Sequence, residues 1–554
     1  MKNSNVLLHS EKVIHSYPHC WRCKKPVIFR ATEQWFISVD KNDLRREALA
    51  AIGNTKWFPP WGETRIRGMI ESRPDWCISR QRSWGVPIPV FYCESCKKPL
   101  MTGSFNKAIR EAVLKEGSDV WFKKEASQIL PSQTKCPHCS GTRFKKETDI
   151  LDVWFESGAS HFAVLKDNPI LRWPADLYLE GSDQHRGWFQ TSLLTSVPTF
   201  ARAPYESVLT HGFTVDEQGR KMSKSLGNVV DPQDVVKKYS ADILRLWVAS
   251  TDFRGDMGAG EGILKHVQEA FIKIRNTCRF LLSNLGDFSE KDIVPYNNLL
   301  EVDKWALLRL NQLIERCLRA YDDFEFHIVY HSIYDFCVND LSALYLDISK
   351  DRLYCDGERS LERRGAQSVL YEILITLIRL FAPILSFTAE DILRYIESSK
   401  LPPSIFLMDM PKVNNKYLDK TLEERWKAIL EVREEVYRAL EDARGEGIIG
   451  SSLEAQVLLY ADGETKRLIE SQIDDLPMVF ITSQVELGAE GTPPSEAVSY
   501  QRVPDLKIVA KKAKGKKCER CWKYSEDVGR SPQHKTLCGR CVNVVEEILK
   551  EGKL

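Results

Sequence analysis

Apolar residues recur with different periods along this chain, and each period predicts a different kind of structure. Between residues 263 and 447 they return at helical spacing, for example in 305–313 and in 369–381, which ends shortly before Pro383. A long region of this kind is typical of a helix bundle. Residues 151–262 instead mix short alternating segments with helical ones, which is the pattern of an α/β fold.

Within the α/β region the alternation predicts two strands, and a polar loop follows each of them. Residues 175–180 form the first predicted strand, and a helical pattern covers 183–196 after a glycine and a serine. The second predicted strand, 207–210, leads into a glycine-flanked loop. A helix should follow this loop, because Asp231 can cap it and Pro232 suits its first position.

The two ends of the chain differ from its middle. Residues 1–150 are irregular, with many tryptophans and prolines and three Cys-x-x-Cys pairs. After the bundle, the apolar runs 455–460 and 478–481 predict strands around a short helix. Residues 511–554 form a small cysteine module behind a run of lysines.

Composition narrows the class of protein. Hydrophobic residues make up 43% and charged residues 28% of the chain, as in ordinary globular proteins, and the formal net charge of +1 excludes a uniformly basic surface. No apolar run reaches the roughly 18 residues of a membrane span, and the N-terminus lacks a signal-peptide core. We therefore expect a cytoplasmic protein without a membrane partner. Its fifteen cysteines then indicate thiols and metal sites.

Two sets of cysteine pairs have the spacing of metal sites. The pairs near the C-terminus are separated by 16 residues, which predicts a closed, structural Zn²⁺ site. Four unrelated thiols at this spacing would be improbable. A second candidate zinc site has a longer intervening loop of 39 residues. The two sets are Cys518, Cys521, Cys538 and Cys541, and Cys93, Cys96, Cys136 and Cys139.

A third pair, Cys20 and Cys23, has no partner pair, so it is either half of a metal site or two reduced thiols. The C-terminal module also carries many cations and an aromatic residue, which together suit an RNA backbone and a stacked base. The alternative is that the lysine run only keeps the module soluble. These residues are Lys511, Lys512, Lys514, Lys516, Lys517, Arg520, Trp522 and Lys523.

The loop between Gly219 and Gly227 contains two lysines and two serines close together in the sequence. A lysine ammonium suits phosphate oxygens, and serine hydroxyls add donors. Activating a carboxylic acid with ATP builds negative charge on the α-phosphate and the departing pyrophosphate, which mobile lysines would stabilise. A solvated basic turn is the simpler alternative. The candidate residues are Lys221 and Lys224 for catalysis, with Ser223, Lys224 and Ser225 for ATP binding.

A second group of polar residues stands where the first predicted strand ends and a helix begins. In open α/β sheets, ligands bind at the carboxyl ends of strands. Glu180 and Asp183 can hold an ammonium group there, Asp183 and Gln184 can bind a ribose hydroxyl, and Trp188 can form a pocket wall. Helix capping by Ser182 and Asp183, with Trp188 in the core, is the structural alternative, and the two do not exclude each other.

Four segments of the sequence resemble those of a known family. Residues 219–228, Gly-Arg-Lys-Met-Ser-Lys-Ser-Leu-Gly-Asn, resemble the second signature of class I aminoacyl-tRNA synthetases. Residues 178–189 resemble the aminoacyl-adenylate site of isoleucyl-tRNA synthetases, and 76–85 and 152–158 match the same family. The resemblance implies that Lys224 contacts ATP and that a set around Glu180 binds the isoleucyl-adenylate. That set is Glu180, Gly181, Asp183, Gln184, Trp188 and Trp154, with His211 beside it at the ATP. Trp154 is equally well explained as a core residue.

The resemblance also implies a fold class, α/β plus all-α. It begins with the C-terminal half of a Rossmann-type catalytic domain and ends with a zinc-ribbon module. The expected domains are 1–60, the return from an editing insertion; 61–150, an insertion with the candidate zinc site; 151–262, the catalytic half; 263–447, the helical anticodon-binding domain; 448–510, a small α/β junction; and 511–554, a tRNA-contacting zinc module.

The activity that the resemblance implies is that of an isoleucine–tRNA ligase. Such an enzyme activates L-isoleucine with ATP, accompanied by Mg²⁺, and transfers it to tRNA(Ile), and the full-length form is expected to be monomeric. The redox or metal-storage alternative rests on the cysteines alone. A non-catalytic tRNA-binding fragment or paralogue is the stronger alternative, although intact Lys224 and Glu180 favour the ligase.

The chain contains no His-x-Gly-His string, the first signature of the class, and no editing insertion. Half of a doubly wound sheet would expose an apolar edge. We therefore expect either a separate N-terminal polypeptide as a partner, or a truncated product or partial sequence. We also expect the isolated chain neither to activate isoleucine nor to edit.

Overall fold

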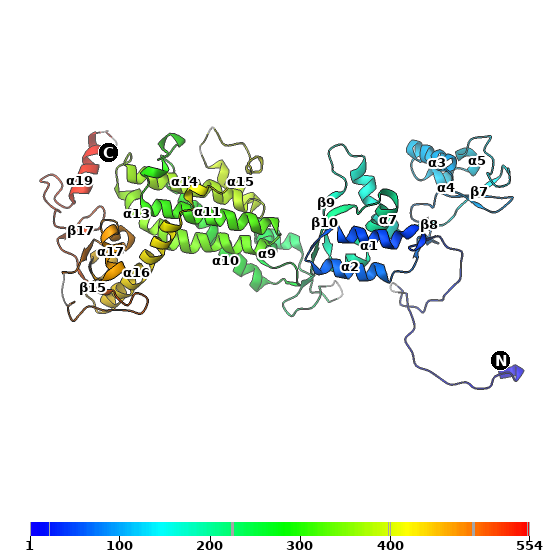
Figure 1. The fold of residues 1–554 in the computed structure, drawn as a ribbon, viewed down its shortest axis with the longest axis horizontal. Helices are drawn as coiled ribbons and strands as arrows, with labels where there is room; N and C mark the ends of the chain where they lie inside the picture. The colour runs from blue at the N-terminus through cyan, green and yellow to red at the C-terminus, as the bar shows by residue number, and fades with distance from the viewer. Residues whose placement is uncertain are drawn as a thin grey trace. The chain divides into compact units, whose positions relative to one another are not determined.

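The computed structural model describes residues 2–20, 23–222, 226–396, 398, 400–489, 493–550 and 552. It divides into two compact units, Met1–Gly212 and Phe213–Leu554 (Figure 1). Among the described helices, none is both long and apolar enough to cross a membrane. The division into six domains remains a prediction.

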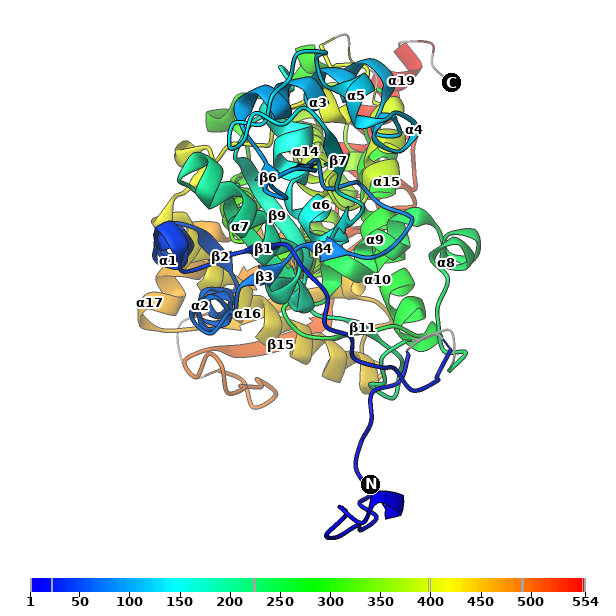
Figure 2. The ribbon, with the colours of Figure 1, turned by 90° about the vertical axis from the view of Figure 1, so that its right-hand side faces the viewer.

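The first unit is built on a parallel sheet of three strands in the order β2-β10-β9. Both strands expected from the alternation are present, as β9 (Ala175–Gly181) and β10 (Tyr205–His211), with β2 (Lys56–Phe58) beside β10. Helix α7 (Trp188–Phe200) connects β9 to β10 and packs beside α1 (Leu44–Gly53), as Figures 1 and 2 show. Because β9 and β10 are parallel neighbours, their carboxyl ends lie side by side.

Apolar side chains from both helices and the sheet fill one core in this unit, including Ile52, Phe189, Leu193 and Val208, none of which is exposed. The predicted helix of 183–196 begins later than expected. A 3₁₀ turn occupies Ser182–Arg186, and α7 starts only after Gly187. The other regular segments around this core are α2 (Trp61–Glu71), α6 (Val153–Gly158), a π-helix (His161–Lys166) and the strand pairs β1 (Phe36–Ile37) with β3 (Trp76–Cys77) and β4 (Ser79–Arg80) with β8 (Ile150–Leu151).

A small separate core holds the cysteine-bearing insertion of the first unit. Three antiparallel strands, in the order β6-β5-β7, pack against short helices around Phe91, Phe105 and Trp121. Each Cys-x-x-Cys pair lies at or next to this sheet, which brings the pairs together. The elements are β5 (Phe91–Cys93), β6 (Pro99–Leu100), β7 (Phe144–Lys146), α3 (Gly103–Glu116), α4 (Val120–Lys123) and α5 (Ala126–Ile129).

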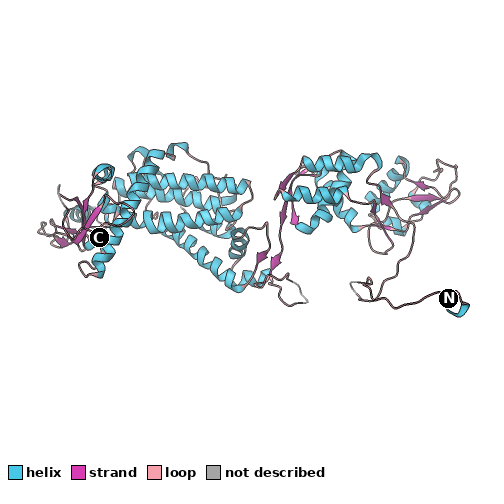
Figure 3. Cartoon of the chain, turned by 60° about the horizontal axis from the view of Figure 1, so that its bottom comes forward, coloured by secondary structure: helices cyan, strands magenta, loops and turns pink. Residues whose placement is uncertain are grey.

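The second unit is mainly the predicted helix bundle, as Figure 3 shows by the predominance of helix. One continuous apolar core extends through it, with Leu310, Leu370, Leu377 and Val436 fully buried. The bundle helices are α10 (Glu261–Ser283), α11 (Glu301–Asp322), α12 (Phe326–Asp335), a π-helix (Phe336–Tyr345), α13 (Leu346–Cys355), α14 (Leu361–Phe381), α15 (Ser386–Arg394) and α16 (Lys420–Gly445).

The helix expected after Asp231 is present but divided. The Asp231 carboxylate accepts a hydrogen bond of 2.8 Å from the Gln233 amide, and Pro232 opens α8 (Pro232–Lys238), as predicted. The chain then turns at Ser240, whose φ is 142°, and α9 (Ala241–Ser250) follows. The Ser240 hydroxyl caps α9, so a second capping residue inside the apolar pattern marks the break. The short strands β11 (Thr214–Val215) and β12 (Met257–Gly258) pair at the start of this unit.

One predicted strand is wrong. Met478 and Val479 end a short helix, α18 (Leu476–Val479), and Phe480 and Ile481 follow in a turn, so these residues form no strand. Pro477 fixes a helical φ early in this turn, and Ile481 ends it with a φ of 56°. Four apolar residues in a row fit a buried strand and a buried turn equally well, so periodicity could not separate them. The strand lies just beyond, as β14 (Gln484–Leu487).

A three-stranded sheet in the order β14-β13-β15 connects the bundle to the cysteine module. Its central strand β13 (Ala455–Tyr460) was predicted, and β15 (Lys507–Lys512) pairs with it antiparallel, across the boundary expected at 510. Helix α17 (Gly463–Gln472) follows β13. The cysteine module itself contains β16 (Lys516–Lys517), β17 (Tyr524–Ser525) and α19 (Gly539–Lys550).

Candidate functional site

The predicted adenylate-binding residues of the first unit gather at the carboxyl ends of β9 and β10. Glu180 and Gly181 end β9, and the strand register sets His211 directly opposite Gly181. The Glu180 side chain is exposed, and its Oε2 accepts a hydrogen bond of 3.0 Å from the Gly181 amide. His211 is half-buried, with Nδ1 2.7 Å from the carbonyl oxygen of Gly212. The strand pairing therefore brings an acid and an imidazole to one edge of the sheet.

The 3₁₀ turn after β9 carries Asp183 and Gln184. Asp183 is exposed to solvent, whereas the Oε1 of Gln184 accepts a hydrogen bond of 2.9 Å from the Trp188 amide at the start of α7. The expected capping of the helix by Ser182 or Asp183 is not observed, because Gly187 precedes α7 and gives no side-chain cap. The capping role thus falls to Gln184, and Asp183 is left exposed to solvent.

The two tryptophans proposed as pocket walls differ in their surroundings. Trp188 stacks on Tyr178 with ring centroids 4.0 Å apart, and its Nε1 donates to the Ser157 carbonyl at 3.0 Å. Trp154 is 42% exposed, and its ring lies near Gly187, where a β-carbon would come within about 3.0 Å of it. Trp154 is therefore the more accessible wall beside this turn.

Sequence reasoning missed His185, which belongs to the same 3₁₀ turn and is its buried residue. Its side chain is fully buried, and its Nδ1 is 3.0 Å from the carbonyl oxygen of Ser182. The imidazole packs against the rings of Trp57 and Trp61, with centroids 6.1 and 5.6 Å away. Burial lowers the pKa of His185, so the ring is neutral at pH 7. It fixes the backbone of the turn that carries Asp183.

The buried neutral His185 predicts a pH-dependent stability of the first unit. A histidine whose folded pKa is lowered contributes its full stability above its ordinary pKa of about 6.5, and loses it as the pH falls below that value. Between pH 6.5 and 5.5 we expect the free energy of unfolding to fall, by at most about 1 kcal/mol from this one site. Urea unfolding followed by tryptophan fluorescence at both pH values measures it.

The matched variants are His185→Phe, which keeps a ring in the aromatic pocket, and His9→Phe at an exposed histidine. His185→Phe should lose less of its free energy of unfolding between the two pH values than the parent protein does. His9→Phe should behave like the parent. An unchanged pH dependence in His185→Phe would exclude this histidine as the titrating group.

The lysine–serine loop belongs to the second unit. Ser223, Lys224 and Ser225 lie outside the described residues. Lys221 forms a β-bridge with Val215, and its Nζ lies 4.3 Å from the centroid of the Phe213 ring.

Asp216 ties the two ends of this loop together, and sequence reasoning missed it. Its carboxylate accepts hydrogen bonds from Asn228 Nδ2 at 2.9 Å and from Arg220 Nε at 2.8 Å. The Asn228 amide and then Arg220 hold the pKa of Asp216 well below its usual range. The turn Asp-Glu-Gln-Gly, which ends at Gly219 with a φ of 74°, was a usable sequence signal for this residue.

The cysteine set of the insertion forms one cluster of four thiols. All four Sγ atoms lie within 4.8 Å of one another, with 3.5 Å between Cys93 and Cys139 and 3.7 Å between Cys96 and Cys136. Tetrahedral zinc with Zn–S bonds of about 2.3 Å requires sulfurs about 3.8 Å apart, so the set fits zinc. The backbone amide of Cys96 chiefly lowers the pKa of Cys93 to about 6, which favours the thiolate.

The C-terminal set forms a second cluster with all four cysteines buried. Cys521 Sγ and Cys538 Sγ are 3.8 Å apart, which again fits a tetrahedral zinc thiolate site. A hydrogen bond from Cys541 lowers the pKa of Cys521 to about 4. Within the described residues, Cys20 and Cys23 belong to no such cluster.

Three family models match successive parts of the chain. The model described as tRNA synthetases class I (I, L, M and V) matches residues 5–259. The model of the anticodon-binding domain of tRNA ligase matches 303–459, and that of the zinc finger found in FPG and IleRS matches 515–544. These ranges cover the parallel sheet, the helix bundle and the C-terminal cysteine module.

Two individual relatives of the chain belong to the same family that these models describe. The chain is 54% identical over 552 residues to the isoleucine–tRNA ligase of Carboxydothermus hydrogenoformans, covering 99% of this chain and 59% of that protein. The corresponding ligase of Moorella thermoacetica is 54% identical over 550 residues, with the same coverage. The chain thus spans less than two thirds of the length of these relatives.

Among solved structures, methionyl-tRNA synthetase of Mycobacterium tuberculosis in complex with methionyl-adenylate matches with a TM-score of 0.50 at 17% identity. The match covers 69% of this chain and 66% of that protein, and it shows the likeness of the fold. Fold, family models and sequence relatives agree: the chain belongs to the class I tRNA synthetases, among relatives that are isoleucine–tRNA ligases.

Proposed function

We propose that this chain is the C-terminal part of an isoleucine–tRNA ligase, which activates L-isoleucine with ATP and transfers it to tRNA(Ile). The observation that carries the proposal is the cluster of Glu180, Asp183 and His211 at the carboxyl edge of β9 and β10. Ligands of open parallel sheets bind at this edge. The 54% identity with isoleucine–tRNA ligases supports isoleucine as the amino acid.

On the amino-acid side of the site, each proposed role follows from the chemistry of the side chain. Glu180 binds the ammonium group of the adenylate, and Asp183 and Gln184 bind its ribose hydroxyls. Trp154 and Trp188 form the walls of the isoleucine pocket. Gly181, which is buried and has no side chain, lets the ligand approach the end of the strand closely.

On the phosphate side, the isoleucine carboxylate attacks the α-phosphorus of ATP, and pyrophosphate leaves with Mg²⁺. Lys221 and Lys224 neutralise the charge that builds on these phosphates. Ser223 and Ser225 donate hydrogen bonds to them, and His211 lies at the ATP. The terminal adenosine hydroxyl of tRNA(Ile) then attacks the acyl carbon and releases AMP.

Zinc and tRNA complete the proposal. Both thiol clusters would hold structural Zn²⁺, because closed sets of four thiolates leave no open coordination position for catalysis. The helix bundle and the cysteine module would bind tRNA(Ile), and the enzyme would act in the cytoplasm as a monomer. The phosphates of tRNA suit the exposed lysines of the module, Lys511, Lys512, Lys514, Lys516 and Lys517.

Isoleucine-dependent exchange of pyrophosphate into ATP tests the ligase proposal. We expect exchange when this chain is mixed with a separate N-terminal polypeptide of a relative that carries the first signature, and none with this chain alone. In the mixture, Lys224→Ala and Glu180→Ala should each lower the exchange rate by about 10²–10³-fold, because each removes a preorganised charge. The matched control is Lys238→Ala, which removes an exposed lysine of α8 that pairs with Glu261 of α10.

Measuring tRNA(Ile) binding by the chain alongside exchange in the mixture separates the two candidate functions. Exchange in the mixture together with tRNA binding supports the ligase. Binding without any exchange in the mixture favours a non-catalytic tRNA-binding protein. Strong exchange by the chain alone would contradict the need for a second polypeptide.

A further inference from the structure

Two neighbouring helices of the first unit carry the tryptophans proposed as walls of the isoleucine pocket. Trp154 lies on the first turn of α6, and Trp188 is the first residue of α7. The distance between the two rings sets the width of that pocket. Width matters for selectivity, because isoleucine exceeds valine by one methylene group and only close packing around that group separates the two amino acids.

The ring of Trp188 is held by stacking and by hydrogen bonds. One face stacks on Tyr178, with ring centroids 4.0 Å apart and an angle of 11° between the ring planes. Its Nε1 donates to two acceptors at the end of α6, the Ser157 carbonyl oxygen at 3.0 Å and the Ser160 hydroxyl oxygen at 3.1 Å. The orientation of the Trp188 ring therefore depends on where α6 lies.

Gly158 at the end of α6 brings this helix into direct contact with α7. A β-carbon at this position would lie 2.8 Å from both the carbonyl carbon and the carbonyl oxygen of Thr191. The backbone of α7 cannot turn aside as a flexible side chain can, so any larger residue must move the two helices apart. The Thr195 hydroxyl donates to the Gly158 carbonyl oxygen at 2.8 Å, which attaches the same point of α6 to the next turn of α7.

The position of Trp154 depends on the same contact. Trp154 lies one helical turn before Gly158 on α6. Its ring lies beside Gly187, where a β-carbon would come within 3.0 Å of two ring atoms. Because Gly187 directly precedes Trp188, the two rings meet the same point of the chain from α6 and from α7. Their separation thus follows from the helix contact at Gly158.

We propose that Gly158 and Ser160 are positioning residues that set the separation of Trp154 and Trp188, and thereby the selectivity of activation for isoleucine over valine. Gly158 fixes the spacing of the two helices, and Ser160 fixes the orientation of the Trp188 ring. Neither residue touches the amino acid, since both act through the tryptophans. The proposal deepens the ligase function proposed above and rests on it.

Exchange of pyrophosphate into ATP, measured with isoleucine and with valine, tests the proposal in the mixture with the N-terminal polypeptide. The assay omits tRNA, so that only activation is measured. Gly158→Ala should lower the ratio of kcat/KM for isoleucine over valine by about 4-fold, the contribution of one well-packed methylene group. The KM of isoleucine should rise, and the KM of ATP should stay unchanged. A loss of folded protein alone would lower kcat and change neither the ratio nor the KM values.

Ser160→Ala tests the role of the hydroxyl separately, because it removes one acceptor of the Trp188 indole and adds no group at the helix contact. We expect the isoleucine-to-valine ratio to fall about 2- to 10-fold, the range that the loss of one hydrogen bond covers. Ser160→Thr keeps a hydroxyl and should retain most of the parent ratio. This pair of variants decides the proposal even if Gly158→Ala does not fold.

Helix α2 of the same unit offers matched controls. Gly68→Ala adds a methyl group to an exposed glycine, where a β-carbon meets nothing beyond its own helix within 4 Å among the described residues. Ser72→Ala removes an exposed hydroxyl that donates only within the same helix, to the Gly68 carbonyl oxygen at 2.9 Å. Both variants should keep the parent ratio and both KM values.

The outcomes separate the positioning proposal from the ligase proposal. If the parent mixture exchanges with isoleucine but Gly158→Ala and Ser160→Ala keep its ratio and KM values, the positioning proposal is wrong and the ligase proposal stands. Equal losses of kcat for both amino acids, with unchanged KM values, would also overturn the positioning role. If the parent mixture gives no exchange, both proposals fail.

Discussion

Removal of zinc should unfold the cysteine module beyond β15 and leave the helix bundle folded. Besides its four cysteines, the core of this module contains few apolar side chains: Val528, Val542 and Val544 are buried, and Leu537 is partly buried. An apolar cluster of this size cannot stabilise an independent fold. Zinc binding to four thiolates contributes on the order of 10 kcal/mol to folding in comparable small modules, so its loss should be decisive.

The variant Cys521→Ser tests this on the whole chain. We expect its zinc content to fall by one atom per chain relative to the parent, and residues 511–554 to become sensitive to trypsin at the lysine run. Far-ultraviolet circular dichroism should change little, because the bundle supplies most of the helix. Cys23→Ser, at an exposed cysteine of the first unit, is the matched control.

A protease-resistant module in zinc-free Cys521→Ser would contradict the zinc assignment. The other cluster offers an internal comparison. Phe91, Phe105 and Trp121 give the insertion a real apolar core next to its thiols. Cys136→Ser should therefore lose its zinc but loosen the insertion less than Cys521→Ser loosens the C-terminal module.

Periodicity predicted the larger elements of this fold because their apolar stripes are long. The strands β9, β10 and β13 were expected, and so was a helix bundle, although not each of its helices. The pattern failed where the run was short, at 478–481, and where a second capping residue interrupted it, at Ser240. In both places a local backbone preference, set by Pro477 or Ser240, outweighed the apolar pattern.

From the sequence, the candidate site could be predicted only where the type and spacing of a residue indicated its role. Glu180, Asp183 and the cysteines stood out by type and spacing. His185 did not, because its role depends on Trp57 and Trp61, which lie more than a hundred residues away in the sequence. Long-range packing is what the structure adds.

A buried ion pair inside the bundle should dominate the stability of the second unit. Arg352 donates to the two carboxylate oxygens of Asp303 at 2.8 and 2.9 Å, and the Tyr345 hydroxyl donates to Asp303 at 2.7 Å. The side chains of Arg352 and Asp303 are 5% and 0% exposed. A charge this deeply buried is tolerated only while its partner is present.

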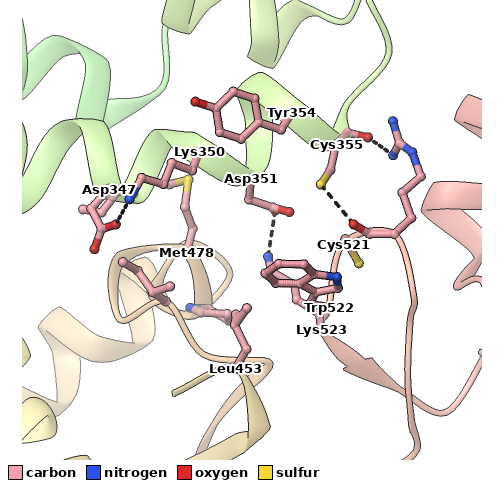
Figure 4. Close-up of a pocket in the computed structure, with 14 residues that line it drawn as sticks. Asp347, Lys350, Asp351, Tyr354, Cys355, Leu453, Met478, Cys521, Trp522 and Lys523 are labelled. Carbon is pink, nitrogen blue, oxygen red and sulfur yellow. Dashed lines mark hydrogen bonds and ion pairs between the residues drawn. The ribbon is translucent and has the colours of Figure 1, made fainter. Parts of the chain in front are cut away.

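Asp303→Asn keeps the size of the side chain but leaves the Arg352 charge unpaired. We expect it to lower the free energy of unfolding by about 3–5 kcal/mol, measured from urea unfolding followed by the helical circular dichroism signal. Asp347→Asn, which breaks an exposed ion pair with Lys350 on α13 (Figure 4), is the matched control and should cost less than about 1 kcal/mol.

The double variant Asp303→Leu with Arg352→Met identifies the cause. If the loss in Asp303→Asn comes from an unpaired buried charge, removing both charges should recover much of it, because two apolar side chains fill the same space without a desolvation cost. If the loss comes from the hydrogen bonds of Asp303 to its neighbours, the double variant should be no more stable than Asp303→Asn. Equal stability of Asp303→Asn and Asp347→Asn would show that the pair does not stabilise the bundle at all.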